Sequence, residues 1–192
     1  MTRLMLKYVA VIDRINRWIG RIVMYGIFVM MAILLWSSLT KVGSDMGFGI
    51  NPSLWTLEMA QFAMVAYYIL GGPYSIQMGS NVRMDLLYGE WSERRKAQVD
   101  AITVLFLVVY LFFLLWGGWD SLMYSFKYGG ERSSSVWRPY LWPIKTIMVI
   151  GIFLMLLQAV SEFFKDILRI RGYDMGPKDV DHGEIETTGN DA

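Results

Sequence analysis

The chain offers few side chains that could carry out chemistry. It has no Cys, and its single His, His182, lies in a polar C-terminal stretch. Disulfides and thiolate metal sites are therefore excluded, and so are bis-imidazole haem ligation, a His metal cluster and a His-based catalytic dyad. No nucleophile–base pair is recognisable, so we expect neither an enzyme nor a bound cofactor or metal.

Glu58 is the side chain best placed for ion chemistry. It stands at the front edge of an uncharged run over residues 59–82 and begins a stripe at helical spacing that continues through Gln61, Val65, Tyr68, Gly72 and Ser75. A carboxylate there could hold a proton or a cation. Alternatively, it is a structural carboxylate bonded to a neighbouring helix or subunit. Because Glu58 is only about one and a half turns from the expected helix start, it is shallow, and the structural interpretation is favoured.

The elements that position these residues are long apolar runs. The composition, 55% apolar and 15% aromatic, is too apolar for an ordinary soluble domain. Charged residues are absent from four runs, at 22–40, 59–82, 101–119 and 146–161. A span needs about 20 residues, which the fourth run reaches only if Lys145 snorkels. We predict an all-α integral membrane protein with four transmembrane helices at about 22–41, 53–78, 93–119 and 142–165.

The distribution of Lys and Arg predicts the orientation. The N-terminal tail, second loop and C-terminal tail hold five, four and four of the 18 Lys and Arg residues, whereas the first and third loops hold one and four. Basic loops stay in the cytoplasm, so both termini should be cytoplasmic and the segments around Asp45 and Gly130 periplasmic. The net charge of +1 gives no case for nucleic acid binding.

The N-terminal segment has the pattern of an amphipathic helix. Apolar residues fall on one face at helical spacing, namely Leu4, Tyr8, Val11, Ile12, Ile15, Trp18, Ile19 and Ile22, and most of the basic residues fall elsewhere. We predict an interfacial helix on the lipid bilayer, the alternative being a plain continuation of the first span. The membrane domain then covers 1–171, and the polar stretch 172–192 is expected to be a disordered cytoplasmic tail.

Further polar residues are candidates for structural or partner contacts. Arg83 and Asp85 end the second span in a turn, with Trp91 on its apolar edge. Glu131 and Arg138 lie in the loop before the fourth span. In that span a stripe of Gly151, Met155, Gln158 and Glu162 is expected to be a packing face.

Several of these residues lie in motifs that carry a family resemblance. The second span opens with Trp55-x-x-Glu58 and leads to Arg83-x-Asp85, although many members carry His where this chain has Asn81. Later motifs are Gly130-Glu131-x-Ser133, Pro139-Tyr140 and Leu157-Gln158. In this order, and with four spans, the chain resembles the small membrane subunit of tripartite ATP-independent periplasmic (TRAP) transporters from the N-terminal helix to Ile170.

The resemblance implies a function and a set of partners. Such a subunit is a static scaffold in the bacterial inner membrane, beside a large permease subunit that carries substrate and sodium by an elevator motion. A periplasmic substrate-binding protein delivers an organic acid. Two other functions remain open from the residues alone: a stand-alone proton-coupled exporter that uses Glu58, and a membrane anchor or assembly subunit of another complex.

Overall fold

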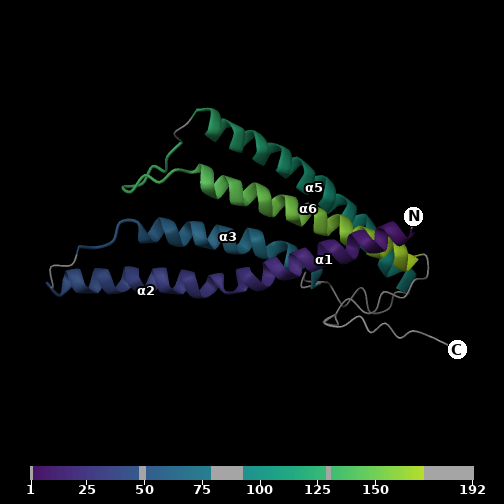
Figure 1. The fold of residues 1–192 in the computed structure, drawn as a ribbon, viewed down its shortest axis with the longest axis horizontal. Coiled ribbons are helices and arrows are strands. Elements are labelled where there is room, and N and C mark those ends of the chain that lie inside the picture. The colour runs from purple at the N-terminus through teal and green to yellow at the C-terminus, as the bar shows by residue number, and fades with distance from the viewer. Residues whose placement is uncertain (1, 48–50, 79–92, 129–130, 171–192) are drawn as a thin grey trace.

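The computed structural model describes residues 2–47, 51–78, 93–128 and 131–170 (Figure 1). Within these ranges every regular element is an α-helix, and a single antiparallel bridge joins Arg132 to Tyr140. The helices are α1 (Thr2–Met24), α2 (Gly26–Asp45), α3 (Thr56–Gln77), α5 (Glu93–Lys127) and α6 (Trp142–Ile170). The predicted all-α fold is confirmed.

The helices form an open row instead of a closed bundle. The order across the row is α2, α3, α6 and α5, and from α2 onward consecutive described helices run in opposite directions (Figure 1). Helix α1 leads into α2 and packs across both α3 and α6. The start of α1 and the end of α6 therefore lie at the same end of the molecule, as the predicted topology with both termini on one side requires. Which side of the membrane this end faces stays a prediction.

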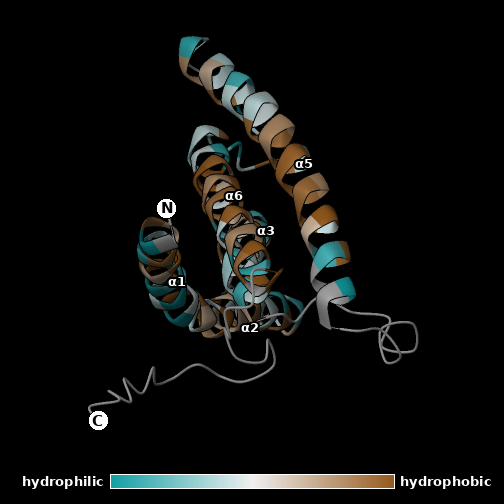
Figure 2. Cartoon of the chain, turned by 90° about the vertical axis from the view of Figure 1, so that its right-hand side faces the viewer, coloured by the Kyte–Doolittle hydropathy of each residue, from teal (hydrophilic) through white to brown (hydrophobic). Residues whose placement is uncertain are grey.

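Among the described residues, three helical segments are long and apolar enough to cross a membrane: Arg3–Asp45, Gln98–Lys127 and Trp142–Leu168. Figure 2 shows the hydrophobic middle of α5 and the hydrophilic residues near its two ends. Helix α3 is not among these segments, because Glu58, Gln61 and several Tyr residues lower its hydropathy. It nevertheless runs between α2 and α6 (Figure 1), so its crossing of the membrane remains a prediction.

Helices α1 and α2 are joined at a single residue, Tyr25. Its N–H bonds to the Ile22 carbonyl at 3.1 Å, and its own carbonyl accepts from the Phe28 N–H at 3.1 Å. Such three-residue bonds tighten the chain locally and let the two helices differ in direction. The N-terminal segment is therefore a helix of its own that leads directly into the next one, inclined to it in Figure 1.

Helix α6 is the centre of the packing. Ile152 and Ala159 on α6 meet Leu111 on α5 in the small apolar core of the described residues. Helix α5 itself extends eight residues beyond the predicted span end at 119, to Lys127. Most of its surface is left uncovered by this chain, including Phe106, which is 72% exposed.

Close approach of α3 and α6 depends on Gly151. A Cβ at this position would lie 2.2 Å from Ile69 Cγ2 and 3.0 Å from the Ile69 carbonyl oxygen. Pro73, which lies inside α3, has no N–H to donate to that carbonyl four residues earlier. The absence of a side chain at Gly151 thus lets α6 pack directly over the carbonyl that Pro73 leaves without its helical bond. The predicted packing face of the fourth span includes this contact.

Candidate functional site: two polar clusters

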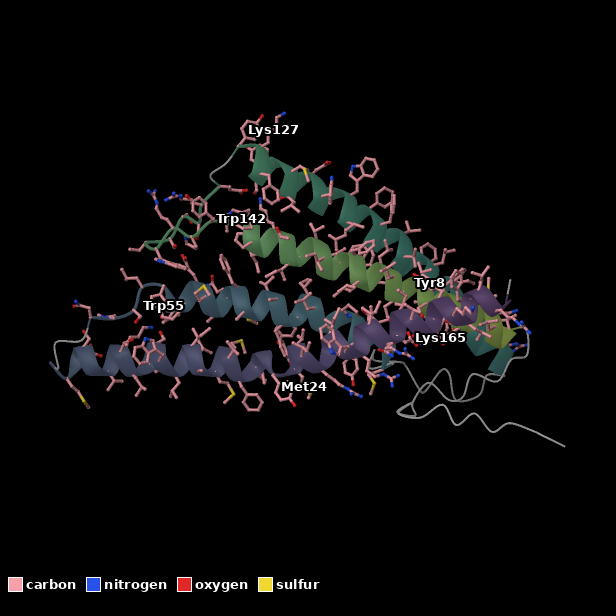
Figure 3. The ribbon with its side chains drawn as sticks, in the orientation of Figure 1. Tyr8, Met24, Trp55, Lys127, Trp142 and Lys165 are labelled. Atoms are coloured by element: carbon pink, nitrogen blue, oxygen red, sulfur yellow. The ribbon has the colours of Figure 1, made fainter. Side chains whose placement is uncertain are left out.

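The first cluster joins α1 to α6 and is called here the α1–α6 cluster. Its members are Asp13 and Asn16 on α1 with Gln158, Ser161, Glu162 and Lys165 on α6. They meet because α1 crosses α6 near the end where both the chain start and the end of α6 lie; Tyr8 and Lys165 mark this crossing in Figure 3.

Gln158 is the central residue of the α1–α6 cluster and is fully buried. Its Oε1 accepts from Asn16 Nδ2 at 2.6 Å. Its Nε2 donates to Asp13 Oδ1 at 2.9 Å and to Glu162 Oε1 at 3.2 Å. Both ends of the amide are therefore occupied by partners within the chain, as burial of a polar group requires.

Lys165 neutralises much of the negative charge in this cluster. Its Nζ lies 2.7 Å from Asp13 Oδ2 and 2.7 Å from Glu162 Oε1. Ser161 adds a hydrogen bond to Asp13 Oδ1 at 3.3 Å. An ammonium group thus already holds the place between the two carboxylates. The arrangement is that of a structural contact that fixes α1 on α6. Among the described residues, no group of three or more His, Cys, Asp or Glu side chains could hold a metal ion.

The second cluster lies at the opposite end and is called the hairpin cluster: Glu58, Ser125, Glu131, Ser133 and Lys145. Glu131 accepts a hydrogen bond from Ser125 at 2.6 Å and pairs with Lys145. The hydrogen bond from Lys145, followed by the one from Ser125, lowers the pKa of the Glu131 carboxyl below its ordinary range. These contacts join the end of α5 to the start of α6 through the connecting segment.

Glu58 takes part in the hairpin cluster from the first turn of α3. Ser133 Oγ donates to Glu58 Oε1 at 3.4 Å, and the residue is 8% exposed. The other carboxylate oxygen is buried and has no hydrogen-bond partner among the described residues. At the same end Thr56 donates to Ser37 Oγ of α2 at 3.0 Å. Glu58 is thus a buried carboxylate that contacts a neighbouring segment of its own chain.

The segment that carries Ser133 closes on itself. The Ser133 N–H donates to the Pro139 carbonyl at 3.0 Å, and the Leu141 N–H donates to the Glu131 carbonyl at 3.1 Å. Arg132 bonds the Tyr140 hydroxyl at 2.6 Å and stacks 4.5 Å above its ring. Arg138 has a φ of 51° at the turn, an unusual conformation for a residue with a side chain. These bonds fix the Ser133 side chain in reach of Glu58.

The candidate residues from the sequence separate into three groups. The first, which bonds to other parts of the chain, consists of Glu58, Glu131 and Gln158. The second is exposed and consists of Arg138, at a turn, and Gln61, which makes no hydrogen bond to a described residue. The other three lie outside the described residues: Arg83, Asp85 and Trp91.

Four members of the α1–α6 cluster were not predicted: Asp13, Asn16, Ser161 and Lys165. One signal was present, because Asp13 is the only acidic residue among the first 21 and lies three residues before Asn16, on the same helix face. Its partner could not be inferred from spacing, since Gln158 lies 145 residues further along the chain.

Fold and clusters together define a small, multi-pass, all-helical membrane protein whose polar side chains mainly fix its own helices. The sequence model of the family described as "Tripartite ATP-independent periplasmic transporters, DctQ component" matches residues 46–169. The chain therefore belongs to this family, a component of inner-membrane transporters and not a known enzyme family. No curated protein and no solved structure matches the chain. The predicted family and the inner-membrane location are confirmed.

Proposed function

We propose that this small permease subunit is a scaffold for the large permease subunit during sodium-coupled, binding-protein-dependent uptake of an organic acid. The observation that carries the proposal is an exposed face of α3 that mixes polar and apolar side chains. This α3 face consists of Leu57, Gln61, Met64, Tyr68 and Ser75. A face of this kind needs a protein partner.

Polar side chains at membrane depth are stabilised by protein, not by lipid. Gln61 and Ser75 are exposed and make no hydrogen bond to a described residue. Tyr68 is 62% exposed on the same face. Helix association in membranes draws on packing and on interhelical hydrogen bonds from such residues. We assign the α3 face to the large subunit for this reason.

The exposed faces of α2 and α5 differ from the α3 face in chemistry. They carry large apolar side chains, for example Leu35 and Phe113, which lipid covers without any hydrogen bond. An apolar groove of about 640 Å³ between α5 and α6 is lined by Phe112, Trp116, Phe153 and neighbouring residues. These surfaces suit either acyl chains or apolar helices, so they do not single out a partner as the α3 face does.

A scaffold role also agrees with how the charged groups are used. Lys165 sits between Asp13 and Glu162, and Lys145 pairs with Glu131. Carboxylates whose charge is already neutralised by a Lys side chain join segments of the chain, and they are not open to a sodium ion or a proton from solvent. We therefore assign the sodium and substrate sites to the large subunit. From the distribution of Lys and Arg, we propose that both termini are cytoplasmic and that the α2–α3 connection is periplasmic.

The experiment measures copurification of a tagged large subunit with variants of this chain. Loss of two hydrogen bonds at about 0.6 kcal/mol each should weaken the complex about eightfold in the double variant Gln61→Leu, Ser75→Leu. Met64→Leu, on the same face and of similar volume, is the matched control and should copurify normally. Unchanged copurification of the double variant would contradict the assignment of the α3 face. Transport by this chain alone in liposomes would contradict the scaffold role.

A further inference from the structure

Helix α1 has three distinct faces. One is buried against α3 and α6 and contains Val9, Ile12, Asn16 and Gly20. The second is an exposed basic stripe of Arg3, Lys7, Arg14 and Arg21. The third is an exposed apolar stripe of Leu4, Val11, Ile15, Trp18 and Ile22. A buried face adjoined by exposed basic and apolar stripes suits a helix that is held by protein and lies at headgroup level.

The basic and apolar stripes meet a groove of about 490 Å³ where α1 joins α2, called here the elbow groove. It is lined by Arg17, Trp18, Arg21, Ile22, Tyr25 and Tyr74, with no acidic side chain on its walls. Arg21 is exposed and makes no ion pair or hydrogen bond to another described residue. The groove therefore combines the positive charge of Arg21 with aromatic and aliphatic surface.

The floor of the elbow groove is fixed by close packing. The ring of Tyr74 on α3 lies so near Gly20 that a Cβ there would come within 2.5 Å of it. The bend at Tyr25 orients the adjacent walls, and Met24 beside it projects away from the helices in Figure 3. Arg21 and Tyr74, which are 53 residues apart in sequence, thus line one groove from two different helices.

We propose that the elbow groove binds the headgroup of an anionic phospholipid. The phosphate would accept hydrogen bonds from the Arg21 guanidinium, a geometry that favours phosphate and carboxylate groups. Trp18 and Tyr25 are residues typical of the membrane–water interface, and Ile22 and Met24 provide an apolar path for the acyl chains. Basic pockets between helices at the membrane surface recognise anionic lipids in this manner.

Charge complementarity favours an anionic lipid over a neutral one, and the apolar margin favours a lipid over a free phosphate. The groove opens beside exposed Trp18, Ile22 and Met24, which a soluble anion would leave in contact with water. Helix α1 and the bend lie outside the residues that match the family. Tyr74 lies within the matched residues, so the groove joins both parts of the chain. The proposal does not rest on the scaffold role.

The test uses the full chain, purified in detergent and titrated with phosphatidylglycerol or with phosphatidylcholine of the same acyl chains, with bound lipid counted by native mass spectrometry. We expect tighter binding of phosphatidylglycerol. Arg21→Gln should lower its affinity about tenfold, since a charge-assisted contact is lost. Arg14→Gln is the matched control, because Arg14 is equally exposed on the same helix but does not line the groove; it should change the affinity less than about threefold.

Location is tested separately with a phosphatidylglycerol analogue that carries a photoreactive headgroup. Crosslinks should map to the residues around Trp18 and Tyr25. Equal effects of the two Arg substitutions, equal affinity for the two lipids, or crosslinks elsewhere would each overturn the proposal. A Cys at Met24 that crosslinks to a Cys at Asp181, with no competition by phosphatidylglycerol, would assign the groove to the acidic C-terminal stretch and would also overturn it. Circular dichroism of both variants verifies that the helices are intact.

Discussion

Asn16 on α1 and Gln158 on α6 form a buried hydrogen bond of 2.6 Å across 142 residues of sequence. Both side chains are at most 1% exposed. Because Gln158 also donates to Asp13, this one amide connects two residues of the N-terminal helix to the central helix of the fold. The bond fixes the position of α1 independently of its link to α2.

Replacement of Gln158 by Leu should destabilise the chain. The substitution leaves buried Asn16 without its acceptor and removes one donor from Asp13, and each such loss costs about 1–3 kcal/mol. We expect a lower unfolding midpoint for the full chain in detergent. Gln61→Leu is the matched control, since Gln61 is exposed and should change the free energy of unfolding by less than about 0.5 kcal/mol. Equal midpoints for the two variants would contradict a stabilising role of the α1–α6 cluster.

Gly151→Ala should separate α3 from α6. The new methyl group would lie 2.2 Å from Ile69 Cγ2 and 3.0 Å from a backbone oxygen, which cannot move aside as a flexible side chain would. Overpacking of this kind costs about 1–3 kcal/mol. Gly117→Ala provides the comparison, because nothing lies within 4 Å of its Cβ position and Ala is the better helix former by about 1 kcal/mol. Thermal unfolding of both variants should therefore shift in opposite directions.

The sequence predicts the local structure well and the contacts between distant segments poorly. Apolar runs and helical spacing indicated helices on both sides of Gly151 and a packing face that includes it. They did not reveal that Asp13 pairs with Lys165, because the crossing of α1 over α6 depends on the bend at Tyr25 and on close packing at Gly20. Likewise Gln61 and Glu58 belong to one predicted stripe, yet only Glu58 is buried, and it contacts Ser133 of the segment that precedes α6.

Acid should loosen the hairpin cluster. The pKa of Glu131 is lowered by its bonds from Lys145 and Ser125. A depressed carboxyl pKa contributes stability above the ordinary Glu value of about 4.3, and that contribution is lost as the pH falls through the lower pKa of the folded state. A spin label on a Cys at Val136, which is 79% exposed, should become more mobile as the pH falls below about 4.

Glu131→Gln tests the cause of that change. The amide cannot form the ion pair with Lys145, so the label should be mobile at neutral pH and show no transition in the acid range. Asp45→Asn is the control, because Asp45 lies at the end of α2 and has no bond in the hairpin cluster. A transition that survives in Glu131→Gln would assign the titration to another group.

Glu58 should act through a contact and not through ion exchange. Its Oε1 accepts from Ser133 Oγ at 3.4 Å, and Glu58→Gln keeps an oxygen at that position while it removes the charge. We expect this variant to support sodium-coupled uptake by the purified complex in proteoliposomes. Glu58→Leu removes the acceptor, so Ser133 loses its bond to α3 and assembly with the large subunit should weaken. Sodium dependence is measured for each variant. Normal assembly combined with loss of uptake in Glu58→Gln would instead make Glu58 an ion-coupling residue, and Ser133→Ala, which removes only the donor, would then leave uptake unchanged.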